Sequence, residues 1–166
     1  MNISSQKILI VDDIEDNRFT LERRLSRSGY SAISQADCGK KALELVKEES
    51  FDLILLDLMM PDISGLEVLK ILKADPKNRS IPVVMVTAAD EIETTAECIS
   101  NGADDYITKP INATLLKARV TACLEKKRFR DSEENYLSKV EADKKRTQTL
   151  LKQVLPEKVA EELNSS

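Results

Sequence analysis

Residues 52–57 read DLILLD, four aliphatic side chains in a row between two aspartates. An unbroken apolar run of this length is typical of a strand that is buried on both faces, because a strand with one wet face would alternate polar and apolar residues. Two further apolar runs occur in KILIV at 7–11 and IPVVMVT at 81–87. Strands covered on both sides belong to parallel sheets with helices on each face, so these runs indicate an α/β protein.

Segments with apolar residues at helical spacing lie between these runs, and two shorter strands complete the pattern. The helices are predicted at 16–28, 39–49, 64–74 and 90–101, and the shorter strands at YSAIS (30–34) and DDYITKP (104–110). In the first helix, Phe19, Leu21 and Leu25 are expected to face the core. Gly29 and Gly102 stand where helices are expected to end. Five strands alternating with helices predict a doubly wound, mostly parallel sheet.

The composition changes near residue 112. Acidic residues outnumber basic ones up to that point, and basic residues outnumber acidic ones after it. From Asn112 to Leu155 the chain has neither glycine nor proline, so one long helix is predicted. The first turns of this helix are expected to pack on the globular part through Leu115, Leu116, Val120 and Cys123.

Residues 125–155 of the same helix carry a heptad pattern in steps of four and three. Its positions are Phe129, Glu133, Tyr136, Val140, Asp143, Thr147, Leu150 and Val154. Five of these eight residues are apolar or aromatic, which predicts a coiled-coil linker that forms a homodimer. The alternative is a solvated helix without a partner. Pro156 is expected to end the helix.

The composition argues against several kinds of chemistry. The chain of 166 residues has no histidine, so a histidine base, metal ligand or phosphohistidine is excluded for it. The apolar runs are too short to span a bilayer and the N-terminus lacks a signal-peptide pattern, which predicts a cytoplasmic protein without a membrane association. Cys38, Cys98 and Cys123 are widely spaced and predict reduced, buried thiols. Basic residues after 125 are interleaved with acids, which disfavours nucleic-acid binding.

Ionisable or hydroxyl side chains stand at the ends of four predicted strands. They are Asp12 and Asp13 after the first strand, Asp57 at the end of the third, Thr87 at the end of the fourth and Lys109 after the fifth. Ligands bind at the carboxyl ends of the strands in an open parallel sheet, so these residues are expected to form one site. Each residue also has a structural alternative: the adjacent aspartates as helix caps, the third aspartate as a loop acid, and the threonine and lysine as strand-end residues.

Three carboxylates at such a site repel one another, so either one binds a proton or a cation neutralises them. The ligands are all oxygen atoms, which favours a hard cation. Mg²⁺ fits best because it takes one or two carboxylates and completes its shell with water and phosphate oxygen. Thr87 and Lys109 offer a hydroxyl and an ammonium group to two further phosphoryl oxygens. The set is suited to phosphoryl transfer to an aspartate.

Five motifs make this chain resemble the receiver domain of two-component response regulators. They are Asp12-Asp13, LILLD (53–57), MMPDISG (59–65), VTA (86–88) and YITKP (106–110), and the resemblance covers about residues 6–124. It implies a flavodoxin-like (βα)5 fold with strand order 2-1-3-4-5 and a receiver domain over residues 1–124, followed by the long helix.

The resemblance also implies a role for each acid of the site. Asp57 would be the phosphoacceptor and a ligand of Mg²⁺. Asp13 would bind the ion directly, Asp12 mostly through water, and Met59 through its backbone carbonyl.

Four other residues receive roles in binding and switching. Thr87 and Lys109 would bind oxygens of the phosphoryl group. The bond between Lys109 and Pro110 would be a cis peptide. Tyr106 would be the switch aromatic, which moves from exposed to buried when Thr87 is drawn toward the phosphoryl group.

LLKQVLPEKVAEEL (150–163) resembles the short segment that precedes the catalytic domain of class III adenylate and guanylate cyclases. Residues 156–166 would then begin a cyclase linker, with the output domain absent from this chain. The alternative is an ordinary helix–proline–helix junction.

These features together predict a phosphorylation-controlled switch rather than a free-standing enzyme. A histidine kinase or histidine phosphotransfer protein would donate the phosphoryl group, and the dimeric helix would transmit its arrival to an adenylate or guanylate cyclase. A stand-alone response regulator acting by protein–protein contacts is the main alternative. An aspartyl-nucleophile Mg²⁺ phosphohydrolase is disfavoured because the first strand lacks a D-x-D pair. No glycine-rich phosphate loop indicates a nucleotide-binding module.

Overall fold

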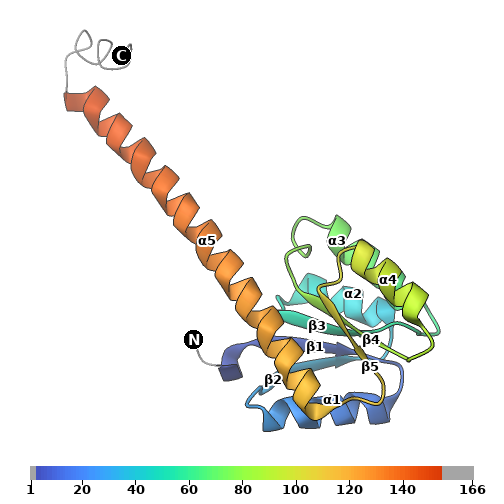
Figure 1. The fold of residues 1–166 in the computed structure, drawn as a ribbon. Coiled ribbons are helices and arrows are strands. Elements are labelled where there is room, and N and C mark those ends of the chain that lie inside the picture. The colour runs from blue at the N-terminus through green and yellow to red at the C-terminus, as the bar shows by residue number, and fades with distance from the viewer. Residues whose placement is uncertain (1–2, 155–166) are drawn as a thin grey trace. The chain divides into compact units, whose positions relative to one another are not determined.

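The structure, a computed structural model, describes residues 3–154, with side chains described as far as residue 147. Strands and helices alternate along this part of the chain (Figure 1). In chain order the elements are η1 (Ile3–Ser5), β1 (Lys7–Val11), α1 (Glu15–Arg27), β2 (Ala32–Ala36), α2 (Gly39–Glu48), β3 (Leu53–Asp57), α3 (Gly65–Ala74), β4 (Val83–Thr87), α4 (Ile92–Ser100), β5 (Asp105–Thr108) and α5 (Ala113–Val154). The predicted alternation of strands and helices is confirmed.

The five strands form one parallel sheet in the order β2-β1-β3-β4-β5. The chain begins in the interior of the sheet at β1, moves outward to β2 and then crosses back to β3, so its direction of travel reverses between β1 and β3. Asp57 pairs with Val86, and Thr87 pairs with Thr108, so β3, β4 and β5 end close to one level. The flavodoxin-like, doubly wound fold and its predicted strand order are confirmed.

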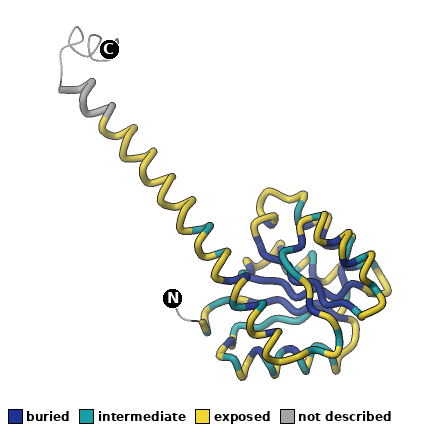
Figure 2. The backbone as a smooth tube through the Cα atoms, in the orientation of Figure 1, coloured by how far each residue is buried: buried dark blue, intermediate teal, exposed yellow. Residues whose placement is uncertain are grey.

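The hydrophobic core has two layers, one on each face of the sheet. Ile8 and Ile10 of β1 point to the face covered by α1 and the first turns of α5, and Leu9 and Val11 point to the face covered by α2, α3 and α4 (Figure 1). Every residue of β3 and β4 is buried, as the dark centre of Figure 2 shows. Full burial of one aliphatic side chain contributes about 1.5–3 kcal/mol. This packing fixes the strand ends that carry the polar residues.

Several helix ends follow from local sequence. The hydroxyl of Ser64, just before α3, accepts a hydrogen bond from the Glu67 amide at 3.2 Å. Gly29 and Gly102 have φ angles of 101° and 105° shortly after α1 and α4, in the left-handed region that glycine adopts without steric cost. The helix ends predicted at these two glycines are confirmed.

The second strand differs from its predicted position. The sequence predicts a strand at 30–34, but β2 spans Ala32–Ala36. Tyr30 is a loop residue that reaches the core and is 4% exposed. The ladder begins where Lys7 pairs with Ala32. Ser34 belongs to the strand although it is polar, because β2 is an edge strand and its residues are mostly half-buried.

Two apolar residues that were expected in the core are exposed, so these predictions are wrong. Phe19 is 63% exposed and Leu115 is 39% exposed. The buried residues of α1 are Leu21 and Leu25, and Phe19 lies about 200° around the helix from Leu21. Leu115 precedes the buried Leu116 and is turned about 100° away from it. In both cases a neighbouring leucine takes the inward position.

All three cysteines are free. Cys98 and Cys123 are buried, as predicted, whereas Cys38 at the start of α2 is only partly buried, which corrects the expectation for that residue. Burial raises the pKa of the Cys123 thiol to about 11, and the nearby charges of Asp104 and Asp105 add to the shift. This thiol is therefore protonated at neutral pH.

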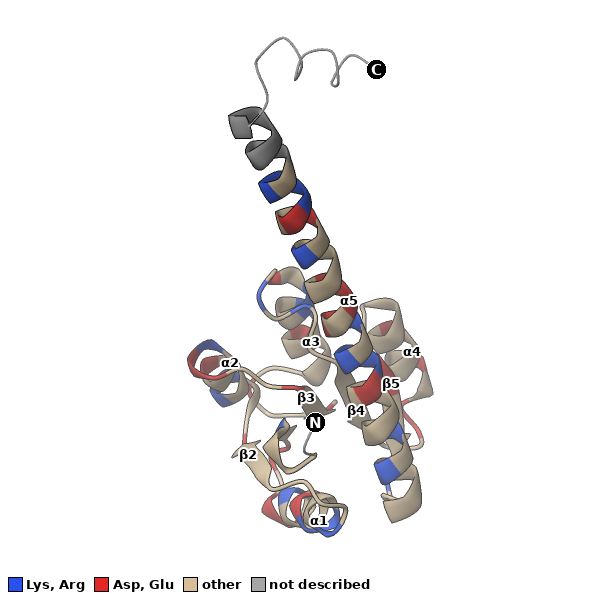
Figure 3. Ribbon diagram, turned by 90° about the vertical axis from the view of Figure 1, so that its left-hand side faces the viewer, with Lys and Arg blue, Asp and Glu red and all other residues tan. Residues whose placement is uncertain are grey.

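The chain divides into two units, residues 1–127 and residues 128–166. Helix α5 runs from the first unit into the second, which confirms the long C-terminal helix. Residues 132–147 are all exposed. Basic and acidic residues are interleaved along this part of the helix, as the blue and red segments of the ribbon in Figure 3 show. No helix in the described part of the chain has both the length and the apolar character needed to cross a membrane. The predicted segment at 156–166 lies outside the described residues.

Candidate functional site

Four strands bring the predicted residues to the same edge of the sheet. Asp12 and Asp13 follow β1, Asp57 ends β3 and Thr87 ends β4. Lys109 follows β5, and its backbone amide donates a hydrogen bond to the Thr87 carbonyl at 2.7 Å. Residues from four separate parts of the chain therefore meet at one place.

The three aspartates form a compact group of oxygen atoms. One carboxylate oxygen from each of Asp12, Asp13 and Asp57 lies within 4.8 Å of the others. Asp12 and Asp57 are 1% and 4% exposed, whereas Asp13 is exposed. Buried carboxylates at this spacing repel one another because little water screens their charges. A positive charge nearby stabilises such a group.

Lys109 supplies a positive charge at this place. Its Nζ donates a hydrogen bond to Oδ1 of Asp57 at 3.2 Å and lies 3.7 Å from Oδ2 of Asp12. Burial acts to lower the pKa of Lys109, but the charges of Asp57 and Asp12 outweigh it and the net shift is upward. The ammonium group is therefore charged at neutral pH and partly neutralises the acids.

The carboxyl group of Asp57 has an unusual affinity for protons. Its pKa is raised from 3.8 to about 6, mainly by burial and further by the charge of Asp12, while Lys109 partly offsets both. The ionised form is the nucleophilic one, and with a pKa of about 6 it exceeds the protonated form by about tenfold at pH 7. Perturbed pKa values of this kind cluster at functional sites.

Hydrogen bonds hold Asp12 in place on three sides. Its Oδ1 accepts from the Ile14 amide at 2.9 Å, its own amide donates to the Ala36 carbonyl at 3.1 Å, and Nη1 of Arg18 donates to its carbonyl at 2.8 Å. Oδ2 is buried and accepts no hydrogen bond from the described residues. The sequence did not indicate the contact of Arg18 with Asp12, because no sequence pattern around an arginine on a surface helix shows which backbone carbonyl it will reach.

Thr87 and Met59 differ in how far they are buried at the site. Thr87 is 1% exposed, and its hydroxyl has no hydrogen-bond partner among the described residues. A buried polar group left unpaired costs about 1–3 kcal/mol, so such a group is typical of a site that receives a ligand. Met59 lies two residues beyond Asp57, and its side chain is 62% exposed. The peptide bond between Lys109 and Pro110 is cis, as the sequence resemblance implies.

The loop that follows Asp57 is closed tightly at its far end. The Gly65 amide donates to the Leu58 carbonyl at 2.8 Å. A Cβ atom at Gly65 would lie 2.2 Å from the Asp57 carbonyl oxygen and 2.9 Å from the Leu58 Cα, both of which are backbone atoms. Glycine is therefore required by the close approach of two backbone segments.

Asp62, in the same loop, is bonded to the start of α2. Its Oδ1 accepts from the Gly39 amide at 3.1 Å and its Oδ2 from the Lys40 amide at 2.9 Å. Desolvation raises the pKa of Asp62. Backbone hydrogen bonds outweigh this effect and lower the pKa to about 2, and the largest of these contributions come from Lys40 and Ile63. Sequence reasoning missed this contact because the partners are 22 and 23 positions away.

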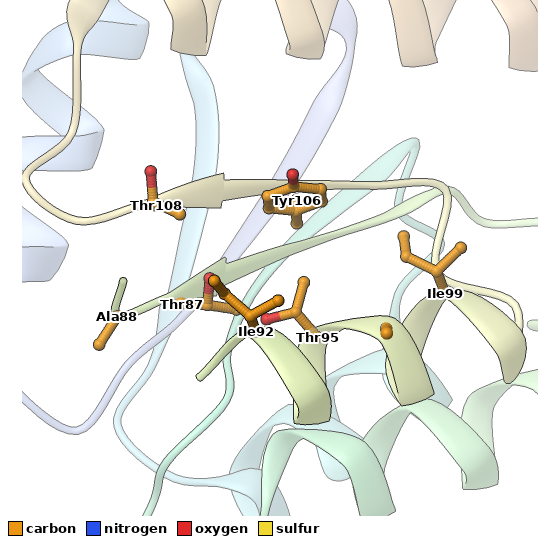
Figure 4. A pocket seen from close by; sticks show the side chains of 8 residues that line it. Thr87, Ala88, Ile92, Thr95, Ile99, Tyr106 and Thr108 are labelled. Carbon is orange, nitrogen blue, oxygen red and sulfur yellow. The ribbon is translucent and has the colours of Figure 1, made fainter. Parts of the chain in front are cut away.

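Tyr106 borders a cavity of about 150 Å³ between α4 and β5. The other lining residues are Thr87, Ala88, Ile92, Thr95, Ala96, Ile99 and Thr108. Figure 4 shows α4 side chains directed toward the strand that carries Tyr106. The buried threonine of the site and the half-exposed tyrosine thus line the same space.

Arg119 on α5 contacts both Tyr106 and the residue before it. Its Nη1 lies 2.6 and 2.7 Å from the two carboxylate oxygens of Asp105, and its guanidinium carbon lies 5.6 Å from the centre of the Tyr106 ring. A cation–π contact at a partly exposed site contributes about 0.5–1 kcal/mol. This contact favours the present position of the ring, which is 40% exposed.

Comparison with known proteins agrees with this geometry. Residues 8–121 match the response regulator receiver domain, and the chain belongs to that family. It is a regulatory domain that acts as a phosphorylation-controlled switch in two-component signalling. Receiver domains of this family interact with histidine kinases or phosphotransfer proteins, and they generally bind Mg²⁺ at an acidic pocket.

The chain spans about a quarter to a half of the length of the curated relatives that it matches. A cyclic di-GMP phosphodiesterase of Thermotoga maritima is 40% identical over 130 residues, which are 78% of this chain and 34% of that protein. The response regulator PleD of Caulobacter vibrioides is 44% identical over 116 residues, which are 70% of this chain and 25% of PleD. The receiver domain of the Francisella response regulator 1452 is similar with a TM-score of 0.67 at 32% identity, over 74% of this chain and 98% of that one.

Proposed function

We propose that this chain accepts a phosphoryl group on Asp57 from a histidine kinase or a histidine phosphotransfer protein. The observation that carries the proposal is the 3.2 Å contact of Asp57 with Lys109 inside a group of three carboxylates. A carboxylate kept only for stability would not be buried beside two like charges, since burial and repulsion both raise its free energy. Groups that oppose stability in this way are expected where function requires them.

Mg²⁺ fits this acidic group. The ligand atoms offered by Asp12, Asp13 and Asp57 are all carboxylate oxygens, which this hard cation prefers. The buried Oδ2 of Asp12, which accepts no hydrogen bond from the described residues, supports the fit. We assign direct coordination to Asp13 and Asp57, contact through water to Asp12 and one carbonyl ligand to Met59. When bound, Mg²⁺ would neutralise the carboxylates and the phosphoryl oxygens during transfer.

In the transfer, a carboxylate oxygen of Asp57 attacks the phosphorus of the donor's phosphohistidine. The new O–P bond makes an acyl phosphate, the N–P bond breaks, and the histidine ring keeps the electron pair of the broken bond. Lys109 and Thr87 then bind two oxygens of the transferred group, the lysine by its charge and the threonine by its unpaired hydroxyl. Attack by water later releases inorganic phosphate and restores the Asp57 carboxylate.

Thr87 couples the phosphoryl group to Tyr106, because the two residues line the same cavity. When the Thr87 hydroxyl moves toward the phosphoryl oxygens, the cavity that it shares with Tyr106 becomes larger. The ring then turns from its half-exposed position into that cavity. A volume of about 150 Å³ is enough to hold benzene in an engineered protein cavity, so the ring is of suitable size. The surface formed by α4, β5 and α5 changes as a result.

Helix α5 is assigned as the element that transmits this change. Residues 129–154 carry the heptad pattern, and the exposed Phe129, Tyr136 and Val140 lie on it. Two copies joined along these positions would form a homodimer. The resemblance of residues 150–163 to a cyclase linker favours an adenylate or guanylate cyclase as the output domain.

A stand-alone regulator that acts by protein contacts is the second candidate. The exposed isoleucines of α4 favour it, since Ile92 is 73% exposed and Ile99 is 42% exposed beside Tyr106. Apolar side chains grouped on a surface are typical of a contact with another protein.

Labelling with acetyl phosphate and Mg²⁺ tests the proposed acceptor. The wild-type chain should gain a hydroxylamine-sensitive phosphoryl group, seen as a mass increase of the intact protein, and Asp57→Asn should gain none. Asp90→Asn removes an exposed acid in the loop before α4 and should label like the wild type. Undiminished labelling of Asp57→Asn would remove this residue from the role. Turnover of a generic phosphomonoester by that variant would indicate a phosphohydrolase instead.

A further inference from the structure

Both loops that carry the proposed metal ligands are bonded to the same short region, residues 36–40, which runs from the end of β2 into the first turn of α2. The Asp12 amide donates to the carbonyl of Ala36, the last residue of β2, at 3.1 Å. Two residues later, Cys38 is the N-cap of α2. From the other direction, the carboxylate of Asp62 accepts hydrogen bonds from the first amides of α2. Residues 36–40 therefore connect the loop after β1 to the loop after β3.

The cap of α2 comes from a distant part of the chain. Cys38 makes no side-chain hydrogen bond to the helix, and the carboxylate of Asp62 takes its place at the Gly39 and Lys40 amides. The first amides of a helix have no partner within it, and they favour a negative charge at that end. A cap supplied by another loop thereby holds that loop as well as the helix.

Close packing at the same point leaves the loop little room. A Cβ atom at Gly39 would lie 2.4 Å from Cγ1 and 2.9 Å from Cδ1 of Ile63, and 2.9 Å from Cγ2 of Val68. Two residues after Ile63, Gly65 approaches the Asp57 carbonyl oxygen with no space for a side chain, so the loop is closed between Asp57 and Gly65. Residues 58–64, which include Met59, are therefore confined by both contacts.

We propose that Asp62 is a positioning residue for the Mg²⁺ site. It holds Met59 and Asp57 at the required separation from Asp12 and Asp13 without contacting the ion. The inference rests on the proposed function, in which these groups bind Mg²⁺. This ion requires nearly octahedral ligands at about 2.0–2.1 Å, so a small shift of one loop lowers the affinity. Loss of a partner outside the ligand shell typically lowers metal affinity by about 10- to 100-fold.

Calorimetric titration of the full chain with Mg²⁺ tests the proposal. Asp62→Ala should raise the Kd for Mg²⁺ about tenfold, at the lower end of the range for such partners, because the residue acts through the backbone. Asp62→Asn keeps one acceptor oxygen and should raise the Kd by less. Asp75→Ala is the matched control, since the Asp75 carboxylate also accepts a backbone hydrogen bond, from Lys77 at 2.9 Å, but at the far end of α3. Its Kd should equal that of the wild type.

Two further measurements separate positioning from the loss of a charge. Gly39→Ala removes no charge, but its Cβ displaces Ile63, so the Kd should rise in this variant too. The loss in Asp62→Ala should persist at high salt, whereas a purely Coulombic effect of an exposed charge would decline with screening. A decline with salt, or a wild-type Kd in Gly39→Ala, would overturn the proposal.

The outcomes distinguish this inference from the proposed function. A wild-type chain that binds no Mg²⁺ would overturn the metal site and the positioning role together. A wild-type chain that binds Mg²⁺, with unchanged Kd values in Asp62→Ala and Asp62→Asn, would overturn only the positioning role. If Asp62→Ala does not fold, Asp62→Asn and Gly39→Ala decide between these results.

Discussion

Replacing Asp57 by asparagine should stabilise the fold at neutral pH when Mg²⁺ is absent. The carboxyl group has a pKa of about 6 in the folded chain against an ordinary value of 3.8, mainly because burial and then the charge of Asp12 disfavour its ionised form. A shift of about two pH units at about 1.36 kcal/mol per unit corresponds to about 3 kcal/mol. Water at the rim of the site screens part of this, so we expect a gain of about 2 kcal/mol in the free energy of unfolding.

The pH dependence of stability tests the same reasoning. The folded chain binds the Asp57 proton more tightly than the unfolded chain does, so the wild type should lose stability as the pH rises from about 4 to about 6. Asparagine does not titrate, so the difference between the two proteins should be near zero below about pH 4 and complete above about pH 7. Urea unfolding in EDTA, followed by far-UV circular dichroism over a range of pH, measures this difference.

Asp62→Asn is a control in which the free energy of unfolding at neutral pH should change in the opposite direction. Desolvation raises the pKa of Asp62, but the backbone hydrogen bonds to its carboxylate together outweigh it and lower the pKa to about 2. The ionised form therefore stabilises the fold above the ordinary value of 3.8, and this contribution is lost as the pH falls through about 2. Asp62→Asn should therefore be less stable than the wild type at neutral pH.

For Asp57→Asn the opposite is expected. If this variant were no more stable than the wild type at neutral pH, burial and repulsion would not destabilise the ionised Asp57 as proposed.

Three other substitutions or truncations probe separate features of the chain. Lys109→Ala should raise the pKa of Asp57 further, since Lys109 lowers it, and an unchanged Asp57 pKa in an NMR titration would contradict this. The same variant should uncouple phosphorylation from the conformational change, and a normal Tyr106 response to phosphorylation would contradict that expectation. Gly65→Ala should destabilise the fold by about 1–3 kcal/mol, because its Cβ would overlap backbone atoms of Asp57 and Leu58. Equal urea midpoints for this variant and the wild type would show that the loop can adjust without loss of stability. Truncation after about Leu124 should weaken dimerisation, and an equal mass in sedimentation equilibrium with and without the tail would reject the coiled coil.

The sequence predicts the sheet well because its signals are local. Unbroken apolar runs such as 53–56 and 83–86 mark strands that are covered on both faces, and all their residues are buried. The polar residues that end these strands come together because parallel strands end at one edge. Asp57 and Lys109 are 52 positions apart, yet their contact follows from this rule and from the order of the strands.

Other features escape the sequence because they depend on partners that are distant in the chain. Nothing around Arg18 or Asp62 indicates which backbone groups they contact, since those groups are fixed by packing of whole elements. Phe19 has the apolar character of a core residue, but the position it takes depends on the face that Leu21 selects. Tyr30 likewise reads as part of a strand, although the pairing with β1 starts two residues later.

The contact between Asp62 and the start of α2 has a consequence for recombination among homologous domains. Exchange of α2 alone would place foreign residues against a loop from the other parent, although the two segments are more than twenty positions apart. Gly39 and Ile63 leave no space for a larger neighbour on either side. Crossovers that keep residues 38–65 from one parent should therefore yield functional chimeras more often than crossovers that separate them.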